Sequence, residues 1–245
     1  MSDASQQLHN SDSTLRLTVQ EAREFGAGVL RRLRFSEEET DIIVDHLVDA
    51  ELCGYSFAGL ARILAIAGRE KKKQSRQEIS VVRETDVSAV VDGGNKVGYL
   101  VIHRAAQIAI EKAKRNGFAL VSAYNSYWSG RNAYYLEMIA RADLAGIHST
   151  ASNSHYVAPL GGARGVFGAN PIAFGFPSSR GPVIFDMGTA AIQHGGLQLK
   201  ALLGEDLPEG IAIDAGGRPT RSPQEALSGA VLSFGGHKGY GLSFT

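Results

Sequence analysis

Asp186 stands at the end of a short apolar run, V-I-F, that follows a turn of composition S-S-R-G-P. A second apolar run, I-A-F-G-F, lies upstream between Pro171 and Pro177. The pattern predicts strand, turn and strand, with Asp186 at the exit of the second strand. A carboxylate in that position, next to glycine-rich backbone, often carries catalytic charge. The structural alternative is that Asp186 only caps the turn before Thr189.

Arg62 is the second residue with clear chemical potential. It closes the stretch G-Y-S-F-A-G-L-A-R. A planar guanidinium fork matches a carboxylate in charge and in geometry, so Arg62 could hold an acidic substrate. The alternative is a salt bridge to a nearby acid.

The stretch N-S-Y-W-S-G-R-N is a candidate cofactor loop. Backbone N–H groups of a glycine-containing turn that enters a helix can cradle a phosphate. A tryptophan there can stack on an adenine or a nicotinamide, and it can equally fill that pocket. The predicted cofactor-binding residues of this loop are Trp128, Ser129, Gly130, Arg131 and Asn132.

Two further segments carry polar groups that could touch a ligand. Asn153 and His155 lie in an ordered loop, N-S-H-Y-V-A-P-L-G-G, and we expect both to contact substrate. The alternative for His155 is a loop histidine hydrogen-bonded to backbone. The segment F-G-G-H-K-G contains His237 and Lys238 in a nest of glycines, where free N–H groups and a lysine make a plausible anion site. His46, on a predicted helix, is interpreted as a surface or core histidine.

Composition narrows the class of protein. The 245 residues are 44% hydrophobic, enough for a sizeable core, and the formal net charge is zero. Zero net charge gives no basic footprint for nucleic acid, and no apolar run approaches a membrane span. A single cysteine, Cys53, suits a reducing compartment, so we expect a cytoplasmic location. Scattered histidines give no metal signature, and no P-loop or G-x-G-x-x-G appears.

The chain divides by its patterning into a polar tail (1–14), a helical segment (15–80) and a mixed α/β segment (81–245). Capping boxes at Thr18 and Ser36 open two helices, and Gly54 closes the second. A tight turn is expected at D-G-G-N. The other expected elements are strands over 79–91, 118–123 and 147–152, and helices over 99–116, 134–145 and 189–203.

Several longer motifs resemble one known family. They are F-G-A-N-P-I-A-F-G-F-P, V-I-F-D-M-G-T-A, I-Q-H-G-G, D-A-G-G-R-P-T and F-G-G-H-K-G-Y-G-L. In this order they resemble the malate/L-lactate dehydrogenase family, whose members bind a nicotinamide dinucleotide without a Rossmann fold. The A-I-Q-H-G variant looks most similar to the branch of delta-1-piperideine-2-carboxylate and delta-1-pyrroline-2-carboxylate reductases.

The resemblance implies a fold and a site. It implies an N-terminal helical domain and a cofactor domain around a largely antiparallel sheet with flanking helices. It implies a homodimer with its active site at the subunit boundary, and NADPH or NADH as cofactor. Arg62 would hold the substrate carboxylate, Asp186 would be catalytic, and Pro177, Ser178 and Ser179 would join the loop residues in binding the cofactor.

The sequence also departs from the family pattern. Phe57 and Ala58 stand where the family has a Ser-His pair, whose histidine donates a proton, and Trp128 replaces another histidine. Family members also continue past Thr245, so we expect a C-terminal part to be absent here.

Three functions therefore remain open. The first is an NAD(P)H-dependent reductase of a small cyclic imine carboxylate. Reduction of such an imine needs less general-acid assistance than reduction of a ketone, because the imine nitrogen is already protonated at neutral pH. The second is a 2-hydroxy acid dehydrogenase of the malate or lactate type. The third is a non-catalytic family member that has lost its proton donor.

Overall fold

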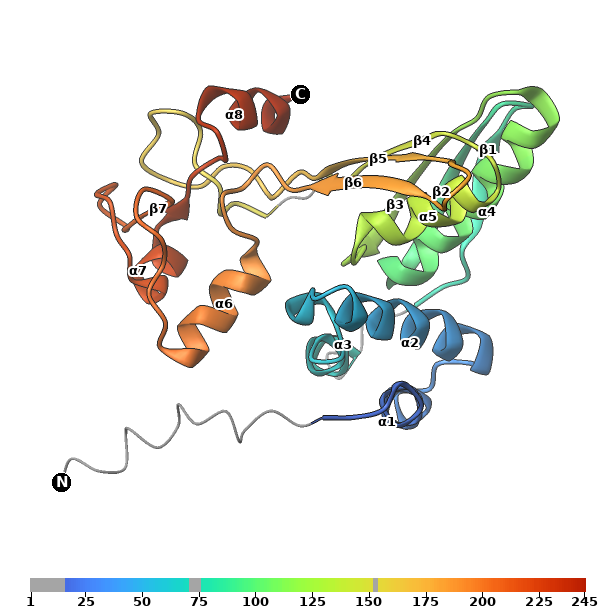
Figure 1. The fold of residues 1–245 in the computed structure, drawn as a ribbon, viewed down its shortest axis with the longest axis horizontal. Helices are drawn as coiled ribbons and strands as arrows, with labels where there is room; N and C mark the ends of the chain where they lie inside the picture. The colour runs from blue at the N-terminus through green and yellow to red at the C-terminus, as the bar shows by residue number, and fades with distance from the viewer. Residues whose placement is uncertain (1–15, 71–75, 152–153) are drawn as a thin grey trace.

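The computed structural model describes residues 16–70, 76–151 and 154–245. In Figure 1 the helices of the N-terminal segment lie below a region of strands, and the C-terminal helices form a separate lobe. The helices are α1 (Val19–Arg32), α2 (Glu37–Leu52), η3 (Ser56–Ala58), α3 (Arg62–Glu70), α4 (Gly98–Asn116), α5 (Asn132–Arg141), α6 (His194–Leu203), α7 (Pro223–Ser228) and α8 (His237–Phe244). The strands are β1 (Ser80–Glu84), β2 (Ser88–Val97), β3 (Leu120–Tyr127), β4 (Gly146–Ser149), β5 (Ile172–Phe176), β6 (Val183–Met187), β7 (Ala212–Ile213) and β8 (Ala230–Val231).

Both predicted capping boxes are present. The side chain of Thr18 accepts a hydrogen bond from the backbone of Glu21, and the Glu21 carboxylate accepts one from the backbone of Thr18. Ser36 and Glu39 make the same reciprocal pair at the start of α2. These bonds satisfy donors that a helix start leaves unpaired. The first two helices therefore begin where the sequence predicts.

The helical segment shares its core with the mixed segment. Leu30, Ile43 and Leu47 are fully buried, and they belong to one cluster with Val97 and Tyr99 at the start of α4. The apolar stripes of α1 and α2 are thus covered by each other and by α4. The division at residue 80 stays a prediction, because these contacts join the two segments.

The segment 80–127 forms a three-stranded sheet in the order β1-β2-β3. The hairpin β1–β2 is antiparallel, and α4 is the crossover that makes β2 and β3 parallel. The prediction that D-G-G-N forms a tight turn is wrong. Those residues lie inside β2, where the pairing register shifts between Asp92 and Lys96. These residues form a bulge inside β2. The Gly94 N–H donates to the Asp92 carboxylate, and pairing with β3 resumes at Lys96.

A second sheet, β4-β5-β6, is fully antiparallel and carries the strand, turn and strand predicted around Pro177. His148, Ala173 and Asp186 are opposite one another across it, so they share one face. Helix α5 packs on that face. The opposite face carries Ile147 and Phe185, which are 70% and 56% exposed.

Two predicted helix boundaries are wrong. Helix α5 spans 132–141 and not 134–145, because Asp143 adopts a positive φ of 64° and Gly146 already begins β4. Helix α6 begins at His194 and not at residue 189. The backbone of the preceding residues is bonded elsewhere: Thr189 N–H donates to Ala169 and Ala191 N–H donates to Leu232.

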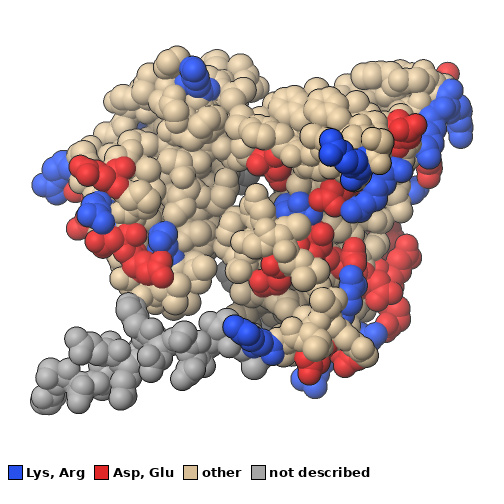
Figure 2. All heavy atoms as spheres, viewed as in Figure 1, with Lys and Arg blue, Asp and Glu red and all other residues tan. Residues whose placement is uncertain are grey.

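The fold class agrees with the prediction: a helical N-terminal segment precedes an α/β part whose strand pairs, apart from β2–β3, are antiparallel. On the face shown in Figure 2, basic and acidic side chains are interspersed, and the surface is indented between the lobe of α6 and the N-terminal helices. Within the part of the chain that the structure describes, no helix combines the length and apolarity needed to cross a bilayer.

Candidate functional site

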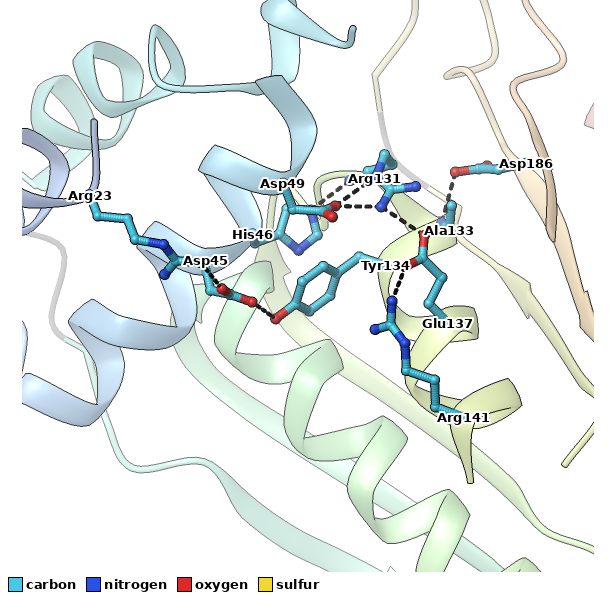
Figure 3. A network of polar contacts seen from close by, with 10 residues as sticks. All are labelled: Arg23, Asp45, His46, Asp49, Arg131, Ala133, Tyr134, Glu137, Arg141 and Asp186. Carbon is cyan, nitrogen blue, oxygen red and sulfur yellow. Dashed lines mark hydrogen bonds and ion pairs between the residues drawn. The ribbon is translucent and has the colours of Figure 1, made fainter. Parts of the chain in front are cut away.

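The turn from Trp128 to Asn132 joins β3 to α5 and is enclosed by polar contacts (Figure 3). Its groups point mostly inward. Arg131 N–H donates to Nε2 of His46 over 2.9 Å, and the Tyr135 hydroxyl donates to the carbonyl of Ser129. Asn132 is 2% exposed. Among the predicted cofactor residues of this turn, Trp128 has the one exposed side chain, at 39%.

Arg131 is committed to carboxylates of the chain itself. Its guanidinium forms ion pairs with Asp49 on α2 and with Glu137 on α5, the latter at 2.9 Å (Figure 3). Burial acts to lower the pKa of Arg131, but the two carboxylates outweigh it and raise that pKa. Its predicted role as a cofactor ligand stays a prediction, but the observed role is to join α2 to α5.

His46 is a core histidine, as one of the two interpretations held. It is fully buried, and the rings of Tyr99, Tyr134 and Tyr135 lie 4.7, 4.5 and 5.3 Å from its centroid. Burial lowers the pKa of His46 to about 3, so the ring is neutral at pH 7. Because Nε2 accepts a hydrogen bond, the proton of the neutral ring is assigned to Nδ1.

Asp186 caps a helix, but not at the turn before Thr189. Its carboxylate accepts a hydrogen bond of 2.9 Å from Ala133 N–H, in the first turn of α5, whose N-cap residue Arg131 makes no side-chain cap (Figure 3). Burial raises the pKa of Asp186, opposed by the Ala133 N–H and by the charge of Arg131. A catalytic role for Asp186 stays a prediction. Its position nonetheless places a partly buried carboxylate directly beside the turn that carries Trp128.

Arg62 lies where three segments meet. It opens α3, donates a hydrogen bond of 3.0 Å to the carbonyl of Phe57, and lies 5.7 Å from the centroid of the Trp128 ring. A Cβ built on Gly195 would stand 2.8 Å from Arg62 Nη2 and 3.0 Å from the Phe57 ring. The guanidinium is half-buried and forms no ion pair with any described carboxylate. The salt-bridge alternative for Arg62 therefore has no support in the described residues.

The first residues of α6 lie next to the guanidinium of Arg62. No side chain caps this helix, whose first residues are His194, Gly195 and Gly196. The ring of Tyr156 lies edge-on to the ring of His194, with 5.0 Å between the ring centroids. Burial and the nearby charge of Arg62 lower the pKa of His194. Because His194 is neutral at pH 7, Arg62 carries the positive charge next to the start of α6.

Other predicted residues lie elsewhere. Pro177, Ser178 and Ser179 form the exposed turn between β5 and β6, where the Ser178 hydroxyl donates to the carbonyl of Gly181. This turn precedes Val183, which lies about 10 Å along the strand from Asp186 at the usual rise per residue. His237 and Lys238 open α8 and are exposed.

The structure does not connect the predicted substrate residues of the 153–155 segment to Arg62: no contact among the described residues joins His155 to it. His155 is exposed. Asn153 lies outside the described residues. Ala58 is buried beside Gly59, within the short helix η3 that α6 contacts.

Sequence reasoning missed several residues that build the site. The start of α6 at His194 and Gly195 comes next to Arg62 only through the fold, and no local pattern marked Tyr156, whose ring packs on His194. The motif I-Q-H-G-G, which carries part of the family resemblance, was the available signal for His194. Among the described residues there is no cluster of three or more potential metal ligands.

This geometry defines an α/β protein in which Arg62, without an ion pair among the described residues, lies beside the exposed ring of Trp128. Residues 17–245 match the malate/L-lactate dehydrogenase family, and the chain belongs to that family. The resemblance found in the motifs is therefore confirmed.

Relatives of this chain include both oxidoreductase types considered. The L-sulfolactate dehydrogenase of Methanothermobacter thermautotrophicus is 38% identical, over 94% of this chain and 68% of that protein. The Delta(1)-pyrroline-2-carboxylate/Delta(1)-piperideine-2-carboxylate reductase of Pseudomonas aeruginosa is 33% identical, over 94% of this chain and 69% of that protein. The solved delta1-piperideine-2-carboxylate reductase of Pseudomonas syringae superposes with a TM-score of 0.86 at 28% identity, covering 94% of this chain and 70% of that one. The chain thus spans about two thirds of the length of these relatives.

Proposed function

We propose that this chain binds a small carboxylate at Arg62 and takes part in its reduction by a nicotinamide cofactor. One observation carries the proposal. Arg62 is a half-buried residue whose guanidinium forms no ion pair with a described carboxylate, and its one hydrogen bond within the described residues goes to the backbone carbonyl of Phe57. A partly desolvated cation without a partner is costly unless a ligand pairs with it. An anionic substrate supplies that partner.

The start of α6 supports the same ligand class. An uncapped helix N-terminus carries partial positive charge and free N–H groups. Gly195 brings that helix start next to Arg62 because it has no side chain to fill the space. A carboxylate could then take a forked contact from the guanidinium and backbone contacts from α6.

The walls around Arg62 favour a monocarboxylate with an apolar, planar body. The Trp128 ring lies beside the guanidinium, and the ring of Phe57 and the guanidinium both border Gly195. A second acidic group, as malate and sulfolactate carry, calls for a second cation. His194 does not provide one at pH 7, since burial and Arg62 lower its pKa.

Within that class we propose a cyclic imine carboxylate of the delta-1-piperideine-2-carboxylate type. Ala58 and Phe57 cannot deliver a proton. An imine nitrogen that is already protonated needs no acid when the carbon receives a hydride, whereas a ketone oxygen needs its proton as charge develops. The 2-hydroxy acid alternative is supported by the sulfolactate dehydrogenase among the relatives. A non-catalytic carboxylate-binding protein is a third candidate, favoured by the same Phe57 and Ala58.

The cofactor we propose is NADPH, with NADH as the alternative. The chemistry of the exposed residues fits a dinucleotide in two places. Trp128 offers a partly exposed indole to an aromatic ring, and Lys238 lies in the first turn of α8, which no side chain caps and whose free N–H groups could meet a phosphate. When bound, the cofactor supplies the hydride. The task of the chain is to hold the substrate carboxylate at Arg62 and to exclude water with Phe57 and Trp128.

We also propose that two copies of the chain associate. The outer face of β4-β5-β6 is apolar and exposed at Ile147, Phe176, Val183 and Phe185. Exposed apolar patches of this kind drive association in water.

Carboxylate binding can be tested without turnover. Pyrrole-2-carboxylate is a planar ring acid that cannot be reduced as an imine, and its binding is measurable by titration calorimetry. We expect Arg62→Gln to abolish binding and Arg62→Lys to weaken it, since a lysine keeps the charge but loses the fork. Arg69→Gln is the matched control on the same helix. Binding that survives Arg62→Gln would contradict the proposed site.

A further inference from the structure

The backbone at Trp128 adopts a conformation that a bulky residue rarely takes. Its φ is +51°, in the left-handed region, and Gly130 follows at +77°. Such a backbone conformation persists where neighbouring groups hold it in place, and it occurs often at functional sites. The question is therefore which groups impose it.

Contacts from three helices fix this turn. His46 on α2 accepts the Arg131 N–H, and Tyr135 on α5 donates its hydroxyl to the Ser129 carbonyl. At the start of α4, a Cβ on Gly98 would stand 2.9 Å from the Ser129 nitrogen and the Trp128 carbonyl carbon. A Cβ on Gly130 would overlap His46 Nε2 and the Tyr99 ring. The turn thus packs closely on His46 and Tyr99, and there is no space for a side chain at Gly98 or Gly130.

His46 makes this contact at a cost to itself. The ring is fully buried, and its Nδ1 has no hydrogen-bond partner in the described residues. An unpaired buried polar atom in a native structure calls for an explanation. An aliphatic side chain would fill the space among the three tyrosines without that penalty, but it could not accept the Arg131 N–H.

We propose that His46 is a positioning residue, which holds the 128–131 turn so that the Trp128 ring lies against Arg62 and sets the width of the carboxylate site. This inference rests on the proposed function for its consequence, but the positioning itself is independent of any ligand. His46 does not touch the site. It acts through the backbone of Arg131 on the indole three residues earlier.

Trp128 is the single tryptophan of the chain, so its fluorescence reports the turn directly. We would compare acrylamide quenching of Trp128, and calorimetric affinity for pyrrole-2-carboxylate, in the parent and four variants. His46→Leu removes the acceptor, and His46→Gln keeps one. Tyr135→Phe removes the second hydrogen bond to the turn without changing the ring. Tyr134→Phe is the matched control, because Tyr134 also packs on His46 but donates its hydroxyl to Asp45.

The expected result is increased quenching and about three- to tenfold weaker probe binding in His46→Leu and Tyr135→Phe, the effect of one lost hydrogen bond. His46→Gln and Tyr134→Phe should stay within about twofold of the parent. If His46→Leu fails to fold, Tyr135→Phe and the rescue by His46→Gln still decide. Unchanged quenching in Tyr135→Phe, or an equal effect of Tyr134→Phe, would overturn the proposal. If quenching changes as expected while no variant and no parent binds the probe, the positioning role stands and the proposed function fails.

Discussion

The carboxylate of Asp186 on β6 lies 2.9 Å from the backbone nitrogen of Ala133 in the first turn of α5. This contact ties the second sheet to the helix that follows the Trp128 turn. It gives Asp186 a structural task that is measurable apart from any catalytic one.

Removing that cap should destabilise the chain. Asp186→Ala is expected to lower the free energy of unfolding by about 1 kcal/mol, the usual cost of a lost helix cap. Asp186→Asn keeps an acceptor and should cost less. Urea denaturation of the three proteins at pH 7 checks this. Equal stability of parent and Asp186→Ala would show that the Ala133 contact contributes nothing.

We expect Asp186 to contribute to the dependence of folding stability on pH. Burial raises its folded-state pKa above the ordinary 3.8, so the folded chain binds more protons than the unfolded chain between the two values. The contribution of Asp186 to stability should therefore fall as pH rises from about 3.8 through the folded-state pKa, and Asp186→Asn should lack this contribution. Urea midpoints across this range measure it. An identical pH profile in the variant would contradict the raised pKa.

His46 should act in the opposite direction. Its pKa is lowered to about 3, so below pH 6.5 the unfolded chain binds a proton that the folded chain does not. Stability should rise with pH between about 3 and 6.5, by up to about 1.4 kcal/mol per pH unit. His148, whose pKa burial lowers to about 4, adds to the same slope. His46→Gln should flatten the slope in part, and a slope that does not change would rule out a buried neutral His46.

The sequence predicted what local rules govern. Thr18 with Glu21 and Ser36 with Glu39 are patterns within one turn, and their helices begin where expected. The antiparallel strands on either side of Pro177 are likewise encoded by short apolar runs and a turn. D-G-G-N misled because a turn-forming sequence can be absorbed as a bulge when pairing continues beyond it.

The site could not be predicted to the same depth, because its contacts join distant segments. His46 and Arg131 are 85 positions apart, and nothing near either residue signals the other. Arg131 was predicted as a cofactor-binding residue from its turn, and nothing near it in the sequence indicated its ion pair with Asp49 on α2. Substrate binding by Arg62 stays a prediction, and whether an acid neutralises its guanidinium depends on which residues the fold brings near it.

The apolar outer face of β4-β5-β6 should govern association. We expect the parent chain to form dimers or larger species, and the double substitution Ile147→Lys with Phe185→Lys to shift it toward monomer, because the charges oppose burial of that face. Leu202→Lys, at an exposed leucine of α6, is the control. Light scattering after size-exclusion chromatography measures the mass. A monomeric parent would refute this.

Restoring a proton donor should change substrate preference. Phe57→Ser with Ala58→His places a group that titrates near neutral pH beside Arg62. General acid assistance is worth about a hundred- to ten-thousand-fold where a proton must be supplied, so turnover of pyruvate should rise more than that of delta-1-piperideine-2-carboxylate. Steady-state NADPH oxidation with each substrate is the measurement. Equal gains on both would show that the proton does not distinguish them.

Arg62 is proposed to hold the carboxylate of a small imine substrate. The most direct test is NADPH oxidation by the parent chain and by Arg62→Gln, with delta-1-piperideine-2-carboxylate, pyruvate and oxaloacetate, the 2-oxo acid that corresponds to malate. We expect activity that is highest with the imine, lowest with oxaloacetate and lost in Arg62→Gln. Equal activity of Arg62→Gln, or a preference of the parent for oxaloacetate, would contradict the proposed role of Arg62.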